Sequence, residues 1–248
     1  MLTKHLLALL AAAAPLALSA APAAAADLGA GFTVNGGATL VSDYRFRGIS
    51  QTDKRFALQG TISVSHESGF YATVWGSSID DYVANGSDQE LDLVAGYKKS
   101  FGATTVDVGV LYYYYPGSGG INSDFFEPYV SVSQAIGPVT AKATANYAPK
   151  QAALSIGAGK EDNLYLAGDV SATIPDTALT LNAHVGHSFG PSYLTIGDEY
   201  TDWSVGASYA VGPLTVGLAY VDTDESAFSP SGRNISKAGV VGSVGVSF

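Results

Sequence analysis

The sequence of 248 residues contains no cysteine, so disulfide bonds play no part in holding its fold together. It also has few basic residues: 12 lysines and arginines stand against 22 aspartates and glutamates, for a net charge of −10. Nucleic-acid phosphates are bound mainly by lysine and arginine, so this composition argues against a nucleic-acid partner. Charged residues make up only 14% of the chain, and the mean hydropathy is slightly positive at +0.18.

Long apolar runs are also missing after residue 26. A transmembrane helix needs roughly 20 consecutive apolar residues, and no stretch there approaches that length. A chain this hydrophobic without a spanning helix is either a soluble protein with a large core or a transmembrane β-barrel. The periodicity of the sequence distinguishes these two classes.

The first 26 residues have the features of a secretory signal peptide. Lys4 gives a positive start, residues 6–20 are apolar and rich in Ala and Leu, and an A-x-A cleavage site ends at Ala26. A membrane anchor is the alternative, but the apolar stretch is short and contains Pro15. We expect export with cleavage after Ala26, which leaves residues 27–248 as a single domain.

Almost every later segment alternates between apolar and polar residues with the period of two that is typical of a β-strand. In residues 139–147, for example, Val139 and Tyr147 share the apolar face, and Lys142 and Thr144 share the polar face. The alternation predicts 12 strands and no helix, at residues 32–40, 56–65, 70–76, 90–98, 105–112, 124–135, 139–147, 163–173, 179–185, 202–209, 214–220 and 237–248.

The connections between these strands alternate strictly between two kinds. The short connections contain Gly or Pro, as hairpin turns require, at residues 66–69, 100–103, 136–138, 174–177 and 211–213. The longer connections lie at residues 42–55, 77–88, 115–123, 149–162, 189–199 and 223–236. Short periplasmic turns and long extracellular loops are typical of transmembrane barrels. We therefore predict an all-β fold, namely an antiparallel up-and-down transmembrane β-barrel. Because the number of strands is even, both termini of the barrel should lie on the periplasmic side.

Aromatic residues gather near both ends of the predicted strands, where interfacial rings of a membrane barrel would lie. Ordinary sheet aromatics are the alternative. One group lies near the short turns and consists of Phe70, Tyr71, Tyr97, Phe101 and Tyr209. The other lies near the long loops and consists of Tyr112, Tyr114, Trp203 and Tyr220. This placement predicts contact with outer-membrane lipids.

The last strand ends on Phe248, with Val246 and Val244 at the alternating positions before it. Such an end resembles the recognition signal of the outer-membrane assembly machinery, which we expect to be a partner. Two further segments, residues 41–53 (VSDYRFRGISQTD) and 66–77 (HESGFYATVWGS), resemble the TorF-type porin family of proteobacteria. This resemblance implies an outer-membrane barrel and carries over no catalytic or ligand residues.

The polar face of the strands predicts the lining of the lumen. Small polar residues dominate it and leave room for water, which favours a narrow channel over a lumen plugged by its own side chains. The predicted pore-lining charges are Glu90, Asp92, Asp107, Lys142, Asp169 and Asp202, with Lys98 in the same phase. Because Asp92, Asp107 and Asp169 outnumber Lys142 in the middle of the strands, we expect a mild preference for cations.

Three basic residues continue the lumen phase toward the mouth: Arg45 and Arg47 after the first strand, and Lys237 on the last. Two interpretations remain open. The basic residues face acidic groups on other strands across the pore, or they pair with loop carboxylates such as Asp53 and hold the mouth shut.

Other function classes find less support in the sequence. A lipid hydrolase on such a barrel needs a serine and a histidine two residues apart on the outer face, and only His66 and Ser68 have that spacing, in a short turn. Neither a metal-ligand spacing nor a cofactor-binding motif is present, so we predict no enzymatic activity, metal or cofactor. A structural or adhesive barrel without an open pore remains the alternative to a porin.

Overall fold

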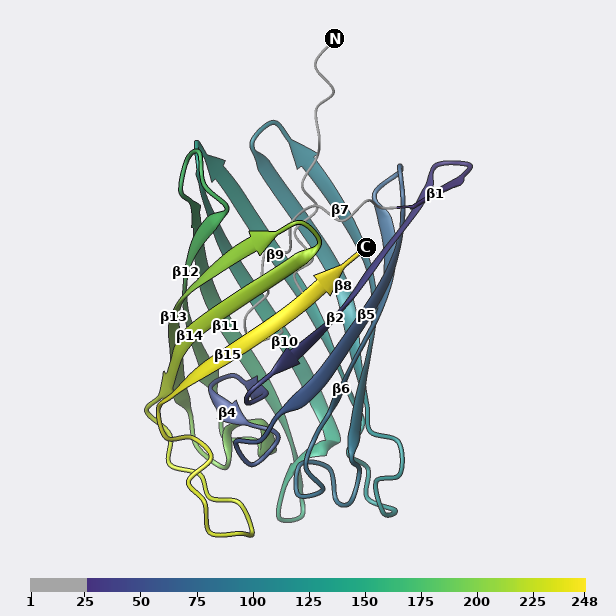
Figure 1. Ribbon diagram of the computed structural model, residues 1–248. Coiled ribbons are helices and arrows are strands. Elements are labelled where there is room, and N and C mark those ends of the chain that lie inside the picture. Colours follow the sequence, from purple (N-terminus) through teal and green to yellow (C-terminus); the bar gives the residue numbers. More distant parts are fainter. Residues whose placement is uncertain (1–25) are drawn as a thin grey trace.

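The structure is a computed structural model that describes residues 26–248, so the predicted signal peptide lies outside the described residues except for Ala26. Twelve antiparallel strands form a closed barrel, each strand pairing with its neighbour along the chain (Figure 1). They are β2 (Phe32–Val41), β5 (Ala57–His66), β6 (Phe70–Ser78), β7 (Gln89–Phe101), β8 (Thr104–Tyr114), β9 (Phe125–Ile136), β10 (Val139–Ile156), β11 (Gly159–Thr173), β12 (Leu179–Phe189), β13 (Tyr200–Val211), β14 (Leu214–Thr223) and β15 (Gly239–Ser247). Within residues 26–248, no helix is long and apolar enough to cross a membrane.

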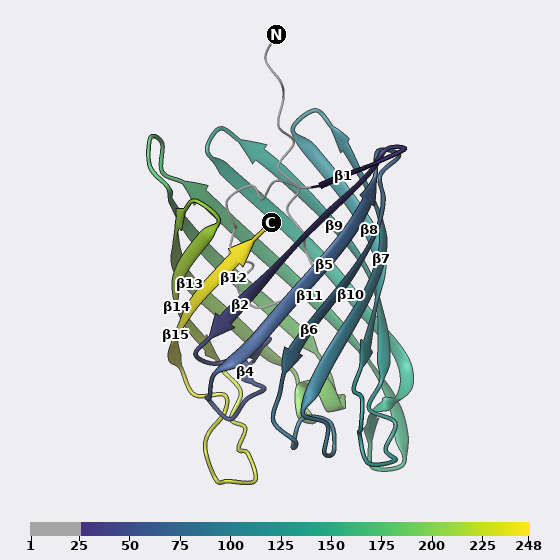
Figure 2. The same cartoon turned by 45° about the vertical axis from the view of Figure 1, so that its right-hand side comes forward.

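The barrel closes where β2 lies between β5 and β15 (Figure 2). At the end of the chain, Phe248 exchanges two backbone hydrogen bonds of 2.9 Å with Gly36. Gly36 suits this position because a Cβ there would lie only 3.0 Å from the Phe248 ring. The short strand β1 (Ala26–Gly29) pairs with β2 beyond this point, so it covers the edge of β2 that β15 leaves open.

The two faces of the barrel have opposite chemistry, as the period-two pattern predicts. Outward apolar side chains are exposed on every side of the barrel, for instance Leu58 at 63%, Val205 at 56% and Leu218 at 60%. Inward positions carry polar side chains, among them Asp107 at 3% and Glu127 at 0% exposure. An apolar outside around a polar inside is the arrangement of a barrel solvated by lipid rather than by water.

The short turns and the long loops lie at opposite ends of the barrel (Figure 1). One predicted loop, residues 149–162, is instead a continuation of β10 and β11 that turns at residues 157–158. Beyond the barrel, the Gln151 side chain bonds both backbone groups of Phe126, at 3.0 and 2.9 Å, and Leu154 is fully buried. The Gln151 side chain thus takes the place of backbone pairing with β9 at this point, and the pairing of β10 with β11 continues past the predicted end.

Six of the nine predicted aromatic residues are exposed near the two ends of the barrel, Tyr97 and Trp203 are half-buried, and Tyr71 is an exception in its direction. Phe70 is 64% exposed, but Tyr71 points into the barrel, where its hydroxyl donates to Asp107 at 2.8 Å. The prediction for Tyr71 was therefore wrong. Consecutive strand residues face opposite sides, and Phe70 takes the outward position opposite Tyr97.

Candidate functional site

The first long loop, residues 42–56, folds into the barrel instead of rising above it. It forms a small hairpin from β3 (Arg45–Phe46) and β4 (Ile49–Ser50), which lies inside the barrel near its loop end (Figure 1). Arg47 and Gly48 form the turn, with positive φ angles of 45° and 81°. A Cβ on Gly48 would lie 3.0 Å from the Cβ atoms of Asp202 and Thr223, so the tip of the hairpin presses against the barrel wall.

Arg47 anchors this hairpin to strands β9 and β11 of the barrel wall. Its Nη2 donates to Oε1 of Glu127 on β9 at 2.7 Å, and its Nη1 donates to Oδ1 of Asn163 on β11 at 2.8 Å. The guanidinium lies 4.1 Å from the centroid of the Tyr165 ring. The side chains of Arg47 and Glu127 are only 2% and 0% exposed, so this ion pair is shielded from water.

The second carboxylate oxygen of Glu127 also has hydrogen-bond partners. Its Oε2 accepts hydrogen bonds from Asn146 Nδ2 at 3.0 Å and from the Tyr113 hydroxyl at 3.3 Å. Phe46 of the hairpin packs edge-on against the Tyr113 ring, with the ring centroids 5.9 Å apart. The contact between the first loop and strands β8 to β11 is therefore mainly polar, with aromatic rings around the charges.

A second anchor lies on the other side of the loop. The Tyr44 hydroxyl is 3.2 Å from both carboxyl oxygens of Glu90 on β7, and the Tyr44 ring packs edge-on against Trp75 at 5.4 Å between centroids. Glu90 is 2% exposed, and Asp92 follows on the same face at 5%. The Oδ1 atom of Asp92 has no hydrogen-bond partner among the described residues.

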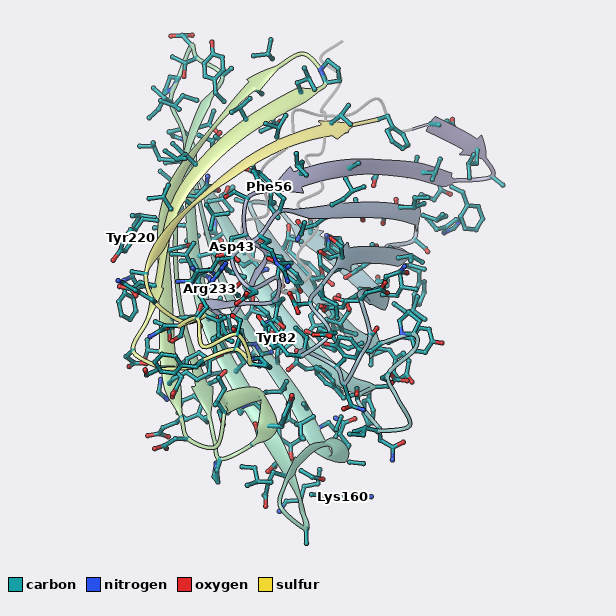
Figure 3. All side chains as sticks on the ribbon, turned by 60° about the horizontal axis from the view of Figure 1, so that its bottom comes forward. Asp43, Phe56, Tyr82, Lys160, Tyr220 and Arg233 are labelled. Atoms are coloured by element: carbon teal, nitrogen blue, oxygen red, sulfur yellow. The ribbon has the colours of Figure 1, made fainter. Side chains whose placement is uncertain are left out.

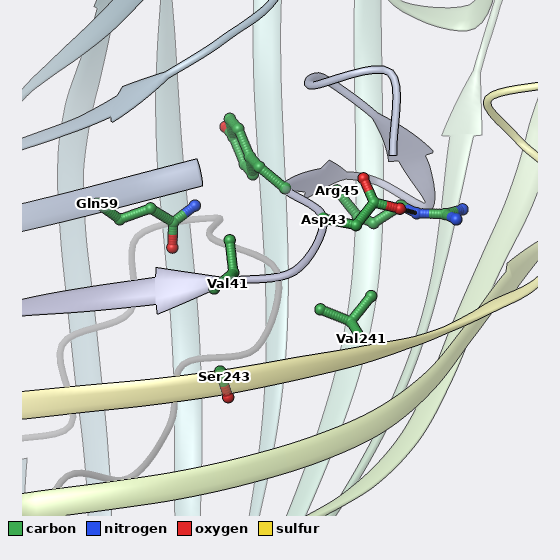
Figure 4. A pocket seen from close by; sticks show the side chains of 7 residues that line it. Val41, Asp43, Arg45, Gln59, Val241 and Ser243 are labelled. Carbon is green, nitrogen blue, oxygen red and sulfur yellow. Dashed lines mark hydrogen bonds and ion pairs between the residues drawn. The ribbon is translucent and has the colours of Figure 1, made fainter. Parts of the chain in front are cut away.

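Within the loop, Arg45 Nε pairs with Asp43 Oδ2 at 2.6 Å, and Nη1 donates to the Gly48 carbonyl at 2.8 Å. A pocket remains between this part of the loop and the barrel wall (Figure 4), lined by Val41, Asp43, Tyr44, Arg45, Gln59, Val241 and Ser243. Arg45 and Arg47 are thus both engaged in ion pairs.

Two other long loops cover the first loop from outside. The Ser50 amide donates to the Ile235 carbonyl at 3.0 Å, and the Tyr82 hydroxyl donates to the Ser50 carbonyl at 2.7 Å. Burial raises the pKa of Tyr82 to about 12, so its hydroxyl keeps the proton that it donates. Figure 3 shows Asp43, Tyr82 and Arg233 together over the loop end, with Tyr220 at the outer edge. Both covering loops therefore form hydrogen bonds with the first loop at Ser50.

Toward the short turns, several charged side chains inside the barrel are more exposed than those around the first loop. Asp107 pairs with Lys98 at 3.4 Å, and His184 lies between Asp169 and Asp202, at 2.7 and 3.1 Å. The side chains of Asp169, His184 and Lys98 are 41%, 26% and 24% exposed. Asp169, His184 and Lys98 in this half therefore remain partly accessible to water, whereas Asp107 is buried.

The structure places the predicted lumen charges on the inner face, in two groups that are joined by His184, which contacts both Asp169 and Asp202. Glu90, Asp92 and Asp202 lie in the half that the first loop occupies, whereas Asp107, Lys142 and Asp169 lie in the half toward the short turns. Val244, Val246 and Phe248 end the last strand on the outer face, with exposures of 50%, 40% and 63%.

The three predicted mouth residues lie in different places. Arg45 and Arg47 lie inside the barrel, while Lys237 is exposed in the loop before β15 rather than on a strand. Its backbone carbonyl, not its ammonium group, contacts Arg45 at 3.2 Å. The prediction that Lys237 continues the last strand was therefore wrong. Asn234 explains the difference, because its Oδ1 accepts the Lys237 amide at 2.7 Å and holds a turn there.

Sequence reasoning missed Glu127 and Asn163 as partners of the first loop, and the contact of Tyr44 with Glu90. The isolated acid Glu127 in the otherwise apolar and aromatic segment 125–132 was a usable signal, because a charge in such a strand needs a partner. The aromatic residues and Pro128 obscured the alternation around it.

The geometry gives little support to a hydrolytic site or to a metal site. His66 Nδ1 is 2.7 Å from Ser68 Oγ, but the pair lies in an exposed turn. On the outer face, His187 contacts Thr201 at 2.9 Å, while Ser188 points inward and is fully buried. Residues 26–248 contain no group of three or more His, Cys, Asp or Glu that could hold a metal ion.

The fold is similar to those of solved structures, and the sequence matches one family model. A family model described as a bacterial protein of unknown function (Gcw_chp) matches residues 24–248. The fold is similar to that of the NanC porin, with a TM-score of 0.59, 15% identity, and coverage of 87% of this chain and 98% of that one. It is also similar to an outer membrane channel from Pseudomonas putida F1, with a TM-score of 0.50, 12% identity, and coverage of 92% and 98%. No protein with curated annotation matches the sequence.

Proposed function

Because the chain belongs to the Gcw_chp family, whose function is unknown, and folds as a closed 12-stranded barrel, we propose that it is an outer-membrane channel for small hydrophilic solutes or ions. The predicted signal peptide with cleavage after Ala26, the terminal strand with its assembly signal and the likeness to TorF-type porins all belong to this proposal. The observation that carries it is the polar interior inside an apolar outer surface.

The first loop narrows the proposed channel at its extracellular half. Its anchors are ion pairs and hydrogen bonds, including those of Arg47 and Tyr44, which water can replace when the loop moves. The half toward the short turns keeps accessible charges such as Asp169. A polar path with one movable constriction is a physical basis for passive permeation.

The charge of the lumen favours cations. Acidic side chains outnumber basic ones inside the barrel: Asp43, Glu90, Asp92, Asp107, Glu127, Asp169 and Asp202 face Arg45, Arg47, Lys98 and Lys142. An excess of carboxylates in a narrow polar lumen attracts cations and repels anions. Because salt screens charges over about 10 Å at 0.1 M, the preference should weaken as salt approaches 1 M.

This selectivity is open to a direct test. In a planar bilayer under a KCl gradient at low salt, the reversal potential of the wild-type channel should have the sign of a mild cation preference. Replacing Asp92, Asp107 and Asp169 together with Asn should abolish that preference, whereas Asp88→Asn in an exposed loop should leave it in place. An anion-selective wild type, or an unchanged potential in the triple variant, would show that other residues control permeation.

A structural or adhesive barrel is the second candidate. One observation favours it: the first loop and its two covering loops fill the extracellular end with buried polar contacts. In that case no current should pass through the protein, with or without the first loop.

A further inference from the structure

Glu90 and Asp92 form a buried carboxyl pair that no cation neutralises within residues 26–248. Both side chains point inward from β7, two residues apart, and they are 2% and 5% exposed. Two adjacent carboxylates cannot both remain ionised without water or a counter-charge. The fold therefore requires another way to neutralise one of them.

The titratable and charged groups around the pair do not provide the missing positive charge. Tyr44 comes from the first loop, and Tyr113 and Tyr115 come from β8 and the residue after it. Glu127 on β9 adds a further negative charge. The nearby basic group is Arg47, but its guanidinium donates to two other partners, Glu127 and Asn163, at 2.7 and 2.8 Å.

The hydrogen bonds indicate where a proton lies. The Tyr44 hydroxyl is within 3.2 Å of both oxygens of Glu90, so Glu90 acts as the acceptor, which is the role of an ionised carboxylate. Asp92 receives no such donor: its Oδ1 is buried without a partner, and its side chain forms a hydrogen bond with Glu90, which requires a proton between the two carboxyls. The neutral carboxylic acid of the pair is therefore Asp92.

We propose that Glu90 and Asp92 share one exchangeable proton while the first loop is docked, and that loss of this proton releases the loop and opens the channel. The opening step rests on the proposed channel function, whereas release of the loop does not. When the loop leaves, water reaches both carboxyls and solvates two charges, so the released state binds fewer protons than the docked state. Raising the pH therefore favours release, by up to tenfold in the equilibrium for each pH unit.

The absence of cysteine allows release to be measured with one engineered thiol. Ile49 in the hairpin is 6% exposed, so a thiol in Ile49→Cys is protected while the loop is docked. Ser226→Cys, at an exposed loop position, serves as the reference for the intrinsic pH dependence of the thiol reaction. The quantity measured is the ratio of the two reaction rates with a water-soluble thiol reagent, in lipid vesicles at increasing pH.

In the wild-type background this ratio should rise with pH, by as much as tenfold per unit through the titration of the pair. Asp92→Asn removes the carboxyl that carries the proton and preserves its shape, so it should make the ratio flat. Glu90→Gln leaves Asp92 buried but removes the neighbouring charge, so the rise should end at a lower pH than in the wild type. Asp88→Asn, an exposed acid in the neighbouring loop, should keep the wild-type slope. A flat ratio in the wild type, or an unchanged slope in both pair variants, would overturn the proposal.

Current recordings on the same variants separate this inference from the channel proposal. If the thiol ratio rises with pH but no condition gives a current, the proton-dependent release stands and the channel function fails. If the protein conducts while both the current and the thiol ratio are independent of pH, the channel stands and the proton switch fails.

Discussion

Replacing Arg47 with methionine should lower the free energy of unfolding by about 3–5 kcal/mol, because it leaves a buried carboxylate without its counter-charge. Glu127 is fully buried, and the Arg47 guanidinium is its partner at 2.7 Å. Asn163 loses a donor to Oδ1 at the same time. Urea titration of the protein in lipid vesicles, followed by tryptophan fluorescence, measures the change.

Two matched variants show whether burial causes this loss. Adding Glu127→Gln to Arg47→Met removes the stranded charge and should recover a large part of the stability. Arg55 offers the exposed comparison, because it pairs with Asp80 but its side chain is 65% exposed. Arg55→Met should cost about 1 kcal/mol or less. Equal losses for Arg47→Met and Arg55→Met would show that the Arg47 contact is not shielded as the structure indicates.

Shortening the first loop should raise the single-channel conductance several-fold. Replacing residues 43–54 with a short Gly–Ser turn removes the hairpin of β3 and β4 from the lumen and leaves the pairing of Val41 with Ala57 in place. The path through the barrel is then limited by its strands rather than by the loop. Recordings in planar bilayers at one salt concentration measure the change.

The extension of β10 and β11 provides the control for this experiment. Its tip carries Lys160 and projects beyond the barrel (Figure 3), so trimming residues 155–160 should leave the conductance close to that of the wild type. An unchanged conductance after shortening the first loop would mean that the loop does not lie in the conducting path.

The strands and their faces could be predicted from the sequence because alternation is a local property. Tyr147 was expected outside and Asp107 inside, and the structure agrees for both. A strand that separates lipid from a polar interior must change character at every residue, so its phase can be read over a few positions. The alternation of short and long connections then predicted that these strands form an up-and-down barrel.

The course of the first loop could not be predicted, because it depends on contacts between residues far apart in the sequence. Arg47 reaches Glu127 across 80 residues and Asn163 across 116. A loop has no periodicity that points to such partners. The two interpretations of the basic residues each describe one arginine: Arg45 pairs with Asp43 inside the loop, and Arg47 faces an acid on a distant strand.

The central claim is that small hydrophilic solutes pass through the polar interior of the barrel. Osmotic swelling of proteoliposomes that contain the purified wild-type protein tests it most directly. We expect the vesicles to swell in isosmotic solutions of small neutral sugars, more slowly as the sugar becomes larger, and faster with the shortened first loop. Swelling no faster than that of protein-free vesicles, for the smallest sugar and for both forms of the protein, would contradict the claim.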